Sequence, residues 1–532
     1  MKAGKSGARR LASKRALSPI AFAAMLSATG VAEAGQYYLN DDTTIDYRLT
    51  ATYGAGMRLS GPSDALINGP IVNGLPAQAN ADDGDRNFKK YSLINNRLTA
   101  LFETNLKHKD FGFDFSAVGF YDQVYRSRND NDSPSTVNKT GPNNEFTDAA
   151  SYFEGRRVRI LNAYAYGGWD LGDSRRLDVR LGNQVVAWGE SLFFSGVASA
   201  QGPADATQAV VPGAEVKDIL LPVPQISLQL QATPRLSFQG YYQFDYKENE
   251  LFPVGSYFST SDIVGPGAEF LRVAPGVNLP YGGEIRPSNA GQGGVGMHYL
   301  VTPKTDVGFY WLNYDDKNPS VVIETSPTPS YKVKYFDNIK MTGASISTRV
   351  GDNQVSGEIT YRQGASILVN TPSGATSTRG DAIQVLGSVI RTFGHSWLAD
   401  EVDVAAEVGY LHVTGVDAVQ MGGLNYSDLY NSRDSAAYEF LVTLQYPNVF
   451  NQWDLAVPIS WAHAVAGNAS IGGAFGSLYG VGDKVLSIGA NFTRLNNLEL
   501  GAAINLYLSS PNPRTHPLAD RTYATVHAKY TF

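Results

Sequence analysis

Cysteine is absent from the 532 residues of the chain. Without thiols, the protein cannot contain a disulfide scaffold, a zinc–thiolate fold or a cysteine nucleophile. Cations are also in the minority, because 43 Lys and Arg accompany 50 Asp and Glu, giving a formal net charge of −7. Binding to nucleic acid needs clustered Lys and Arg to neutralise phosphates. We therefore expect no nucleic-acid partner.

Long apolar runs are missing as well, since no segment after residue 34 reaches the roughly 20 apolar residues that a membrane-spanning helix needs. The first 34 residues have a basic beginning, a small apolar middle and the A-x-A pattern Ala32-Glu33-Ala34 at the end. This order predicts a secretory signal peptide over residues 1–34, cleaved before Gly35. The mature chain, 35–532, is then periplasmic, secreted or an outer-membrane β-barrel.

Apolar and polar residues alternate over long stretches of the mature chain. From Ile45 to Leu59, every second side chain is apolar and the intervening ones are polar or glycine. Such a stretch is longer than a usual strand of about 5 to 6 residues in a soluble protein, but it suits a tilted transmembrane strand. The alternation continues to the end of the chain, where Ala524 to Tyr530 form the apolar face and Phe532 is the last residue. This ending resembles the C-terminal signature that the outer-membrane barrel assembly machinery recognises.

The same pattern predicts eighteen strands, with sixteen as the second choice. Their expected ranges are 45–59, 93–106, 111–125, 156–169, 177–188, 224–232, 236–247, 293–301, 306–315, 339–350, 354–363, 380–392, 401–413, 437–446, 453–463, 482–494, 498–508 and 521–532. With this division, every odd-numbered connection is longer than every even-numbered one, as expected for long outer loops and short periplasmic turns. Because an open sheet edge cannot face hydrocarbon, we predict an all-β fold, a closed antiparallel up-and-down transmembrane barrel in the outer membrane of a Gram-negative cell.

One long connection, at about 189–223, differs from the others because it is rich in apolar residues. We expect this segment to fold inward and constrict the pore, whereas the alternative is a latch packed on the barrel wall. The residues expected to line the constriction are Trp188, Glu190, Phe193, Phe194, Glu215 and Lys217.

Charged residues opposite the apolar stripe should face the lumen. Basic ones come early in the chain and acidic ones mostly later: Arg48, Arg58 and Arg180, then Glu358, Glu401, Asp403, Glu407 and Glu499. If the two groups face one another across the lumen, they create a transverse field that orients dipolar solutes. The alternative is that these side chains are merely solvated.

Three short motifs resemble a known family. The first is the run Leu181–Ser191. The second consists of two short runs, Pro212–Lys217 and Leu221–Pro224, and the third is the run Phe244–Lys247 together with Leu251. Together they resemble the proteobacterial outer-membrane family catalogued as domain of unknown function 1302, although Asn183 stands where many relatives are expected to have Arg. The resemblance implies an outer-membrane protein, often encoded near genes for degradation of hydrophobic or aromatic compounds or near resistance-nodulation-division exporters. It implies no catalytic residues.

Other motifs are weaker. Gly291–Gly296 satisfies G-x-G-x-x-G, but a strand-like run follows it where a nucleotide site needs a helix. The acidic runs Asp82–Asp85 and Asp130–Asp132 could coordinate Ca²⁺, yet we expect solvated loop tips and no metal site or cofactor. A lipid-surface hydrolase needs a Ser and His pair on the lipid face, and none is evident, so we expect no enzyme.

The sequence thus favours a porin-like channel for diffusion of small organic solutes, hydrophobic or aromatic ones included. Two alternatives stay open: a non-conducting component that partners a periplasmic protein or an inner-membrane exporter, and a surface receptor or adhesin built from the loops around 248–292. In each case the expected surroundings are outer-membrane lipid and lipopolysaccharide.

Overall fold

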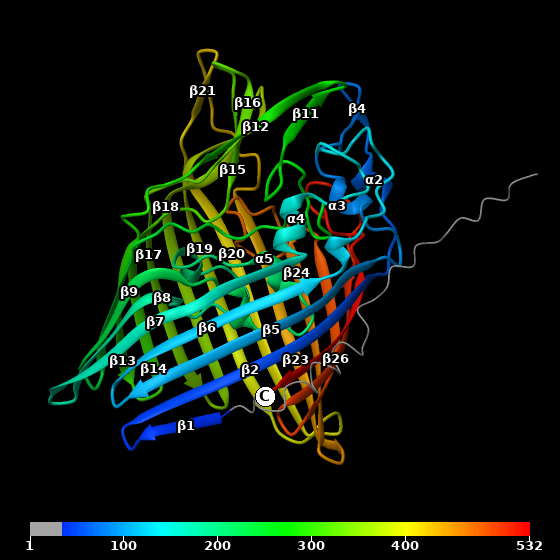
Figure 1. The fold of residues 1–532 in the computed structure, drawn as a ribbon. Helices are drawn as coiled ribbons and strands as arrows, with labels where there is room; N and C mark the ends of the chain where they lie inside the picture. Colours follow the sequence, from blue (N-terminus) through cyan, green and yellow to red (C-terminus); the bar gives the residue numbers. More distant parts are fainter. Residues whose placement is uncertain (1–34) are drawn as a thin grey trace, which may run out of the picture.

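A computed structural model describes residues 35–532, so the predicted signal peptide lies outside the described residues. In this part of the chain, eighteen antiparallel strands pair in sequence order, and the first pairs with the last to close a barrel (Figure 1). The barrel strands are β2 (Thr43–Arg58), β5 (Leu93–His108), β6 (Phe111–Asp122), β7 (Arg156–Gly172), β8 (Arg175–Gln184), β9 (Val223–Thr233), β10 (Leu236–Gln243), β13 (Gly293–Thr302), β14 (Thr305–Tyr314), β17 (Ile339–Val350), β18 (Asn353–Thr371), β19 (Gly374–Phe393), β20 (Glu401–Val416), β23 (Asp434–Phe450), β24 (Trp453–Ala466), β25 (Lys484–Arg494), β26 (Leu498–Tyr507) and β27 (Tyr523–Thr531). The predicted all-β barrel and its eighteen strands are confirmed.

Closure depends on the register between β2 and β27, in which Thr50 lies opposite Thr531 and Arg58 opposite Tyr523. The rest of β2, toward its beginning, pairs with the additional strand β1 (Gly35–Asn40), which the sequence pattern did not predict. Among the described residues, no helix is long and apolar enough to cross a membrane.

The alternation of side chains separates two surfaces of the wall. Val526 on β27 is 54% exposed and Val408 on β20 is 60% exposed, because both point away from the barrel axis. Their neighbours Thr525 and Glu407 point inward, where Thr525 lines a cavity and Glu407 is buried. The alternation of apolar and polar residues along each strand therefore gives the barrel an apolar outer face and a more polar inner face.

Long connections gather at one end of the barrel and short turns at the other (Figure 1). The expected difference in length fails at one place. The connection between β18 and β19 consists only of Pro372 and Ser373, fewer residues than the turn 394–400 at the opposite end. The reason is that residues 364–379, expected as a loop, continue both strands beyond the barrel rim as a hairpin, after a bulge between Arg362 and Ala365.

The long connections contain structure of their own. The short strands are β3 (Ile71–Val72), β4 (Leu75–Pro76), β11 (Phe270–Ala274), β12 (Val277–Ile285), β15 (Ser320–Glu324), β16 (Ser330–Lys334), β21 (Val419–Met421) and β22 (Leu424–Tyr426). The short helices are α2 (Asp64–Ile67), α3 (Asp83–Arg86), η1 (Val124–Arg126), α4 (Asp148–Phe153), η2 (Val197–Ala200), α5 (Ala206–Ala209) and α6 (Val216–Ile219). Strands β11, β12, β16 and β15 form a four-stranded sheet at the end of the barrel that carries the long loops.

Candidate pore and its internal segment

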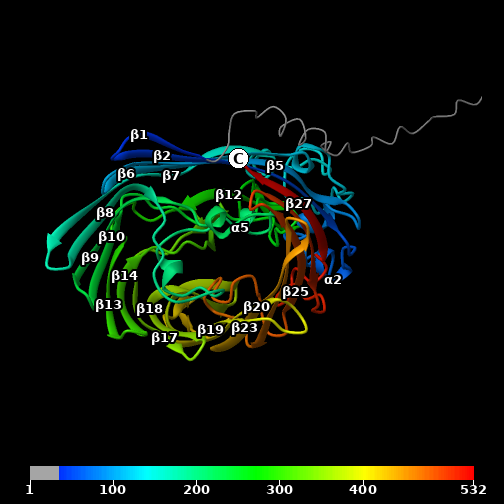
Figure 2. The same cartoon turned by 90° about the horizontal axis from the view of Figure 1, so that it is seen from below.

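The connection between β8 and β9, residues 185–222, lies within the ring of strands. Figure 2 shows the barrel along its axis, with α5 inside the ring. We call residues 185–222 the internal segment. Its side-chain and backbone contacts reach strands on opposite sides of the barrel, so it crosses the lumen.

Two wall carboxylates hold the first turn of the internal segment. Glu407 on β20 accepts hydrogen bonds from the backbone N–H groups of Leu192 (3.0 Å), Phe193 (2.7 Å) and Phe194 (2.8 Å). Glu358 on β18 accepts from the backbone N–H groups of Glu190 (2.9 Å) and Val197 (2.7 Å). A turn with five outward-pointing N–H groups therefore binds two carboxylates, which satisfies both partners inside the barrel.

Neighbouring contacts strengthen this attachment. Arg362, on the same face of β18 as Glu358, donates to the carbonyl oxygen of Ser195 at 3.1 Å and to Oε1 of Gln384 at 2.6 Å. Phe194 is buried against Phe475, with ring centroids 5.4 Å apart. The turn is thus fixed by hydrogen bonds and by apolar packing together.

The aromatic start of the internal segment packs on another part of the wall. The ring of Trp188 lies 5.1 Å from the ring of Tyr241 on β10 and 6.3 Å from that of Tyr310 on β14. Phe193 lies at the edge of the hydrophobic cluster around Phe194. These aromatic side chains contact the wall of the barrel, as the latch interpretation expects, although Phe193 also borders a cavity.

The second half of the internal segment contacts the opposite wall. Asp205 forms an ion pair with Arg159 on β7, with 2.7 Å between Nη1 and Oδ2. Gln208 in α5 accepts a hydrogen bond of 3.1 Å from the buried Arg97 on β5. The guanidinium group of Arg97 also lies 3.4 Å from the ring centroid of Phe120.

Charged groups beyond α5 form a continuous chain of ion pairs. Its successive nitrogen–oxygen distances are 2.7 Å for Arg48–Glu103, 3.0 Å for Lys217–Glu103, 3.4 Å for Lys217–Glu215, 3.2 Å for Lys529–Glu215, 3.4 Å for Lys529–Glu499 and 2.8 Å for His527–Glu499. The cationic side chains Arg48, Lys217 and Lys529 alternate with carboxylates along this chain, and the imidazole of His527 contacts the last carboxylate. Each of these Arg and Lys charges therefore has an opposite charge beside it.

This pairing differs from the transverse field expected from the sequence. Arg48 and Glu499 belong to the same ion-pair chain, and Arg58 is buried against Asp85 at the end that carries the long loops. Glu358 and Glu407 are 4% and 1% exposed beneath the internal segment, so they bind backbone N–H groups and do not line an open pore. The expectation failed because their partners are backbone groups distant in sequence.

Two other residues expected at the pore contact side chains of the neighbouring wall strands. Arg180 on β8 lies 5.7 Å from the ring centroid of Tyr164, and its side chain is exposed. Asp403 accepts from Thr392 Oγ1 at 2.6 Å and from Gln445 at 3.3 Å.

Space for solutes is found on both sides of the internal segment. One cavity of about 390 Å³ lies between its first half and strands β14 and β18, and Phe193, Asn249, Lys317 and Arg362 are among its lining residues. A second cavity of about 300 Å³ lies between Pro212 and the wall formed by β23 to β27. Small and polar side chains dominate that wall: Ser460, Ser487, Gly489, Asn491, Ala503, Asn505 and Thr525.

A buried cluster of charges joins the long loops to the rim. Asp85 in α3 pairs with Arg58 at 2.6 Å and with Arg521 at 3.1 Å. Both guanidinium groups also lie over the ring of Tyr257, at 5.6 and 5.4 Å from its centroid. Nothing in the spacing of these residues along the sequence indicates that they meet.

Solved structures that are similar to this chain cover most of its length at low sequence identity. One is OccAB4 of Acinetobacter baumannii, with 10% identity and a TM-score of 0.43, covering 93% of this chain and 100% of that one. OccAB1 of the same species has 8% identity and a TM-score of 0.46, covering 94% of this chain and 99% of that one. OpdK of Pseudomonas aeruginosa with vanillate has 10% identity and a TM-score of 0.40, covering 92% of this chain and 98% of that one. A search of curated proteins found no match. The model of the family described as protein of unknown function DUF1302 matches residues 15–532, so the chain belongs to this family.

Proposed function

We propose that this protein is an outer-membrane channel through which small organic solutes diffuse, hydrophobic and aromatic ones included. The observation that supports this most strongly is the polar-lined space beside the internal segment, inside a closed cylinder whose outer face is apolar. A ring of 16 to 18 strands is wide enough for an aqueous channel unless a plug fills it. Here the internal segment crosses the lumen and leaves cavities on both of its sides.

The chemistry of the lumen supports a channel with weak charge preference. Because Glu103, Lys217, Glu215, Lys529 and Glu499 are paired with one another, few net charges face the solute. Apolar groups such as Leu192 and Phe193 lie beside polar ones at the first cavity. Such a lining suits solutes that carry a ring or short chain together with a few polar groups.

The size of the internal segment should set the conductance. We expect refolded residues 35–532 to give stepwise currents in planar bilayers, and deletion of Ser191–Gly202 to increase the size of each step. Circular dichroism should confirm a folded barrel in both proteins. A folded barrel without current would contradict the diffusion channel and favour a non-conducting component that partners a periplasmic protein or an exporter. An unchanged step after the deletion would show that this segment does not limit the pore.

In this proposal, the final strand, β27, directs insertion of the protein into the outer membrane. Tyr530 and the terminal Phe532 pack with ring centroids 4.6 Å apart at the end of β27. We propose that the barrel assembly machinery binds this end of the chain, and that lipopolysaccharide contacts the rim with the long loops.

A further inference from the structure

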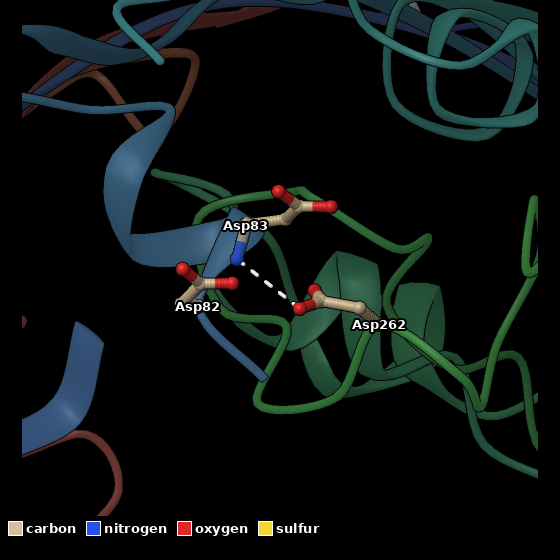
Figure 3. Close-up of side chains that lie close together, drawn as sticks. All are labelled: Asp82, Asp83 and Asp262. Carbon is tan, nitrogen blue, oxygen red and sulfur yellow. Dashed lines mark hydrogen bonds between the residues drawn. The ribbon is translucent and has the colours of Figure 1, made fainter. Parts of the chain in front are cut away.

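Three aspartates from two long loops meet above the barrel. Asp82 precedes α3 and Asp83 begins it in the connection 59–92, whereas Asp262 comes from the connection 244–292 (Figure 3). Their side chains are 0%, 5% and 0% exposed, and one oxygen of each lies within 4.8 Å of the others. The solvated loop tip expected for Asp82 and Asp83 is therefore wrong, because the loops fold over both side chains.

The hydrogen bonds around the three aspartates leave oxygens without donors. Asp83 accepts from Asn131 Nδ2 at 3.1 Å and from the backbone N–H of Asn138 at 3.0 Å, both in the connection 123–155. Oδ2 of Asp262 accepts from the backbone N–H of Asp83 at 3.2 Å. Within residues 35–532, however, Oδ1 of Asp262 and Oδ1 of Asp82 are fully buried without a hydrogen-bond donor.

A further buried oxygen belongs to a residue whose backbone contacts Asp83. Asn138, whose backbone N–H donates to Asp83, is 1% exposed, and its own Oδ1 has no donor among the described residues. A buried acceptor without a donor costs about 1–3 kcal/mol, and more when it is charged. Two of the three carboxylates in this group therefore each have a buried oxygen that could bind a cation.

Charge balance leads to the same conclusion. In the described part of the chain, Arg86 is the ion-pair partner of this group, through Asp82. The three carboxylates are buried side by side, where their negative charges are poorly solvated. A divalent cation would offset two of the three negative charges.

The structure assigns to Asp82, Asp83 and Asp262 a binding site for a divalent cation of the Ca²⁺ type, which joins the loops over the mouth of the barrel. All available ligands are oxygens, the donors that Ca²⁺ prefers, and no thiol or imidazole favours a transition metal here. Oxygens that share one Ca²⁺ at about 2.3–2.6 Å lie at most about 5 Å apart, as this group does. Through Asn131 and Asn138, the site also connects the third loop.

This site does not depend on conduction, so it can be tested separately. The refolded chain, freed of metal with EGTA, is titrated with CaCl₂ by calorimetry and with TbCl₃ by luminescence. We expect one site per chain, at least tenfold weaker binding in Asp262→Asn, and greater protection of the long loops from trypsin when Ca²⁺ is present. Asp132→Asn is the matched control, because Asp132 is an exposed acidic residue of a neighbouring loop, 75% exposed, and should bind as the unaltered protein does.

Three results would overturn the assignment. The first is the absence of saturable Ca²⁺ binding by the folded, unaltered protein. The second is equal binding by Asp262→Asn and the unaltered protein, which would place the ion elsewhere. The third is a pair of results: without metal, the loops of Asp262→Asn are cleaved more slowly than those of the unaltered protein, and Ca²⁺ does not change the cleavage of the unaltered protein. Together they would show that the carboxyl groups share protons and bind no cation. Should Asp262→Asn fail to fold, Asp82→Asn replaces it, and the titration of the unaltered protein still decides.

Discussion

The attachment of the internal segment by Glu407 predicts a specific change in conductance. Glu407→Gln keeps the length of the side chain but replaces a carboxylate, which accepts three N–H groups at 2.7–3.0 Å, with an amide that offers one oxygen. The amide oxygen can take the place of Oε2 and keep the bonds from Phe193 and Phe194, so the bond from Leu192 is lost. A hydrogen bond to a charged group contributes about 1.5–3 kcal/mol, so this loss costs about 2 kcal/mol. It shifts the equilibrium between the attached and detached turn by a factor of about 30.

The remaining contacts keep most of the internal segment in place. Glu358 still accepts from Glu190 and Val197, and Asp205 still pairs with Arg159. We therefore expect a folded barrel in which the turn Leu192–Phe194 moves, seen in single-channel recordings as larger mean current and more frequent fluctuation between levels. The thermal unfolding of the barrel should change little.

A matched control separates attachment from charge. Glu439 on β23 lies directly opposite Glu407 in the strand pairing. Glu439→Gln makes the same chemical change on the same face of the neighbouring strand, but Glu439 accepts no hydrogen bond from Leu192–Phe194 in the described structure, so this variant should leave the current level and its fluctuation unaltered. If the two variants give indistinguishable recordings, Glu407 does not hold the turn and the reasoning fails.

Two more predictions concern buried charges. Asp85→Asn should lower the free energy of unfolding by about 3 kcal/mol, because the buried guanidinium groups of Arg58 and Arg521 then share Asp520 as their remaining carboxylate, and a urea midpoint equal to that of the unaltered protein would contradict this. Burial lowers the pKa of Lys317, at the wall of the larger cavity, to about 8, so it loses its positive charge as pH rises from 7 to 9. The permeability of anions relative to cations should therefore decrease over that range in reversal-potential measurements and stay constant in Lys317→Met; an identical pH response in both would refute the assignment.

The barrel could be predicted from the sequence because contact with lipid places the same requirement on every strand of the wall. Each strand must present an apolar face outward, so alternation such as that of Ala524 to Tyr530 is visible without knowledge of any partner. The hairpin extension of β18 and β19, residues 364–379, was missed because its apolar alternation is confined to Ala365, Ile367 and Val369, while the returning residues 370–379 are mostly polar. The strand β1 was missed because it adds to an end of β2.

The interior could be predicted only in part. The apolar composition of 189–223 indicated an inward position, because such side chains are costly in water. The roles of Glu358 and Glu407 had no local signal, since their partners are backbone N–H groups more than 160 residues away. The same holds for Asp262, which meets Asp82 and Asp83 only through the folding of two separate loops.

Adjacent residues on the last strand allow the most direct test of a water-filled interior. Thr525 lines the cavity beside the internal segment, and Val526 points to the lipid. The chain has no native cysteine, so Thr525→Cys and Val526→Cys each carry a single thiol. In planar bilayers, a charged, water-soluble methanethiosulfonate should reduce the current of Thr525→Cys and leave that of Val526→Cys unchanged. Reaction at Val526→Cys, or no effect on a conducting Thr525→Cys barrel, would contradict a channel that runs through the inside of the barrel.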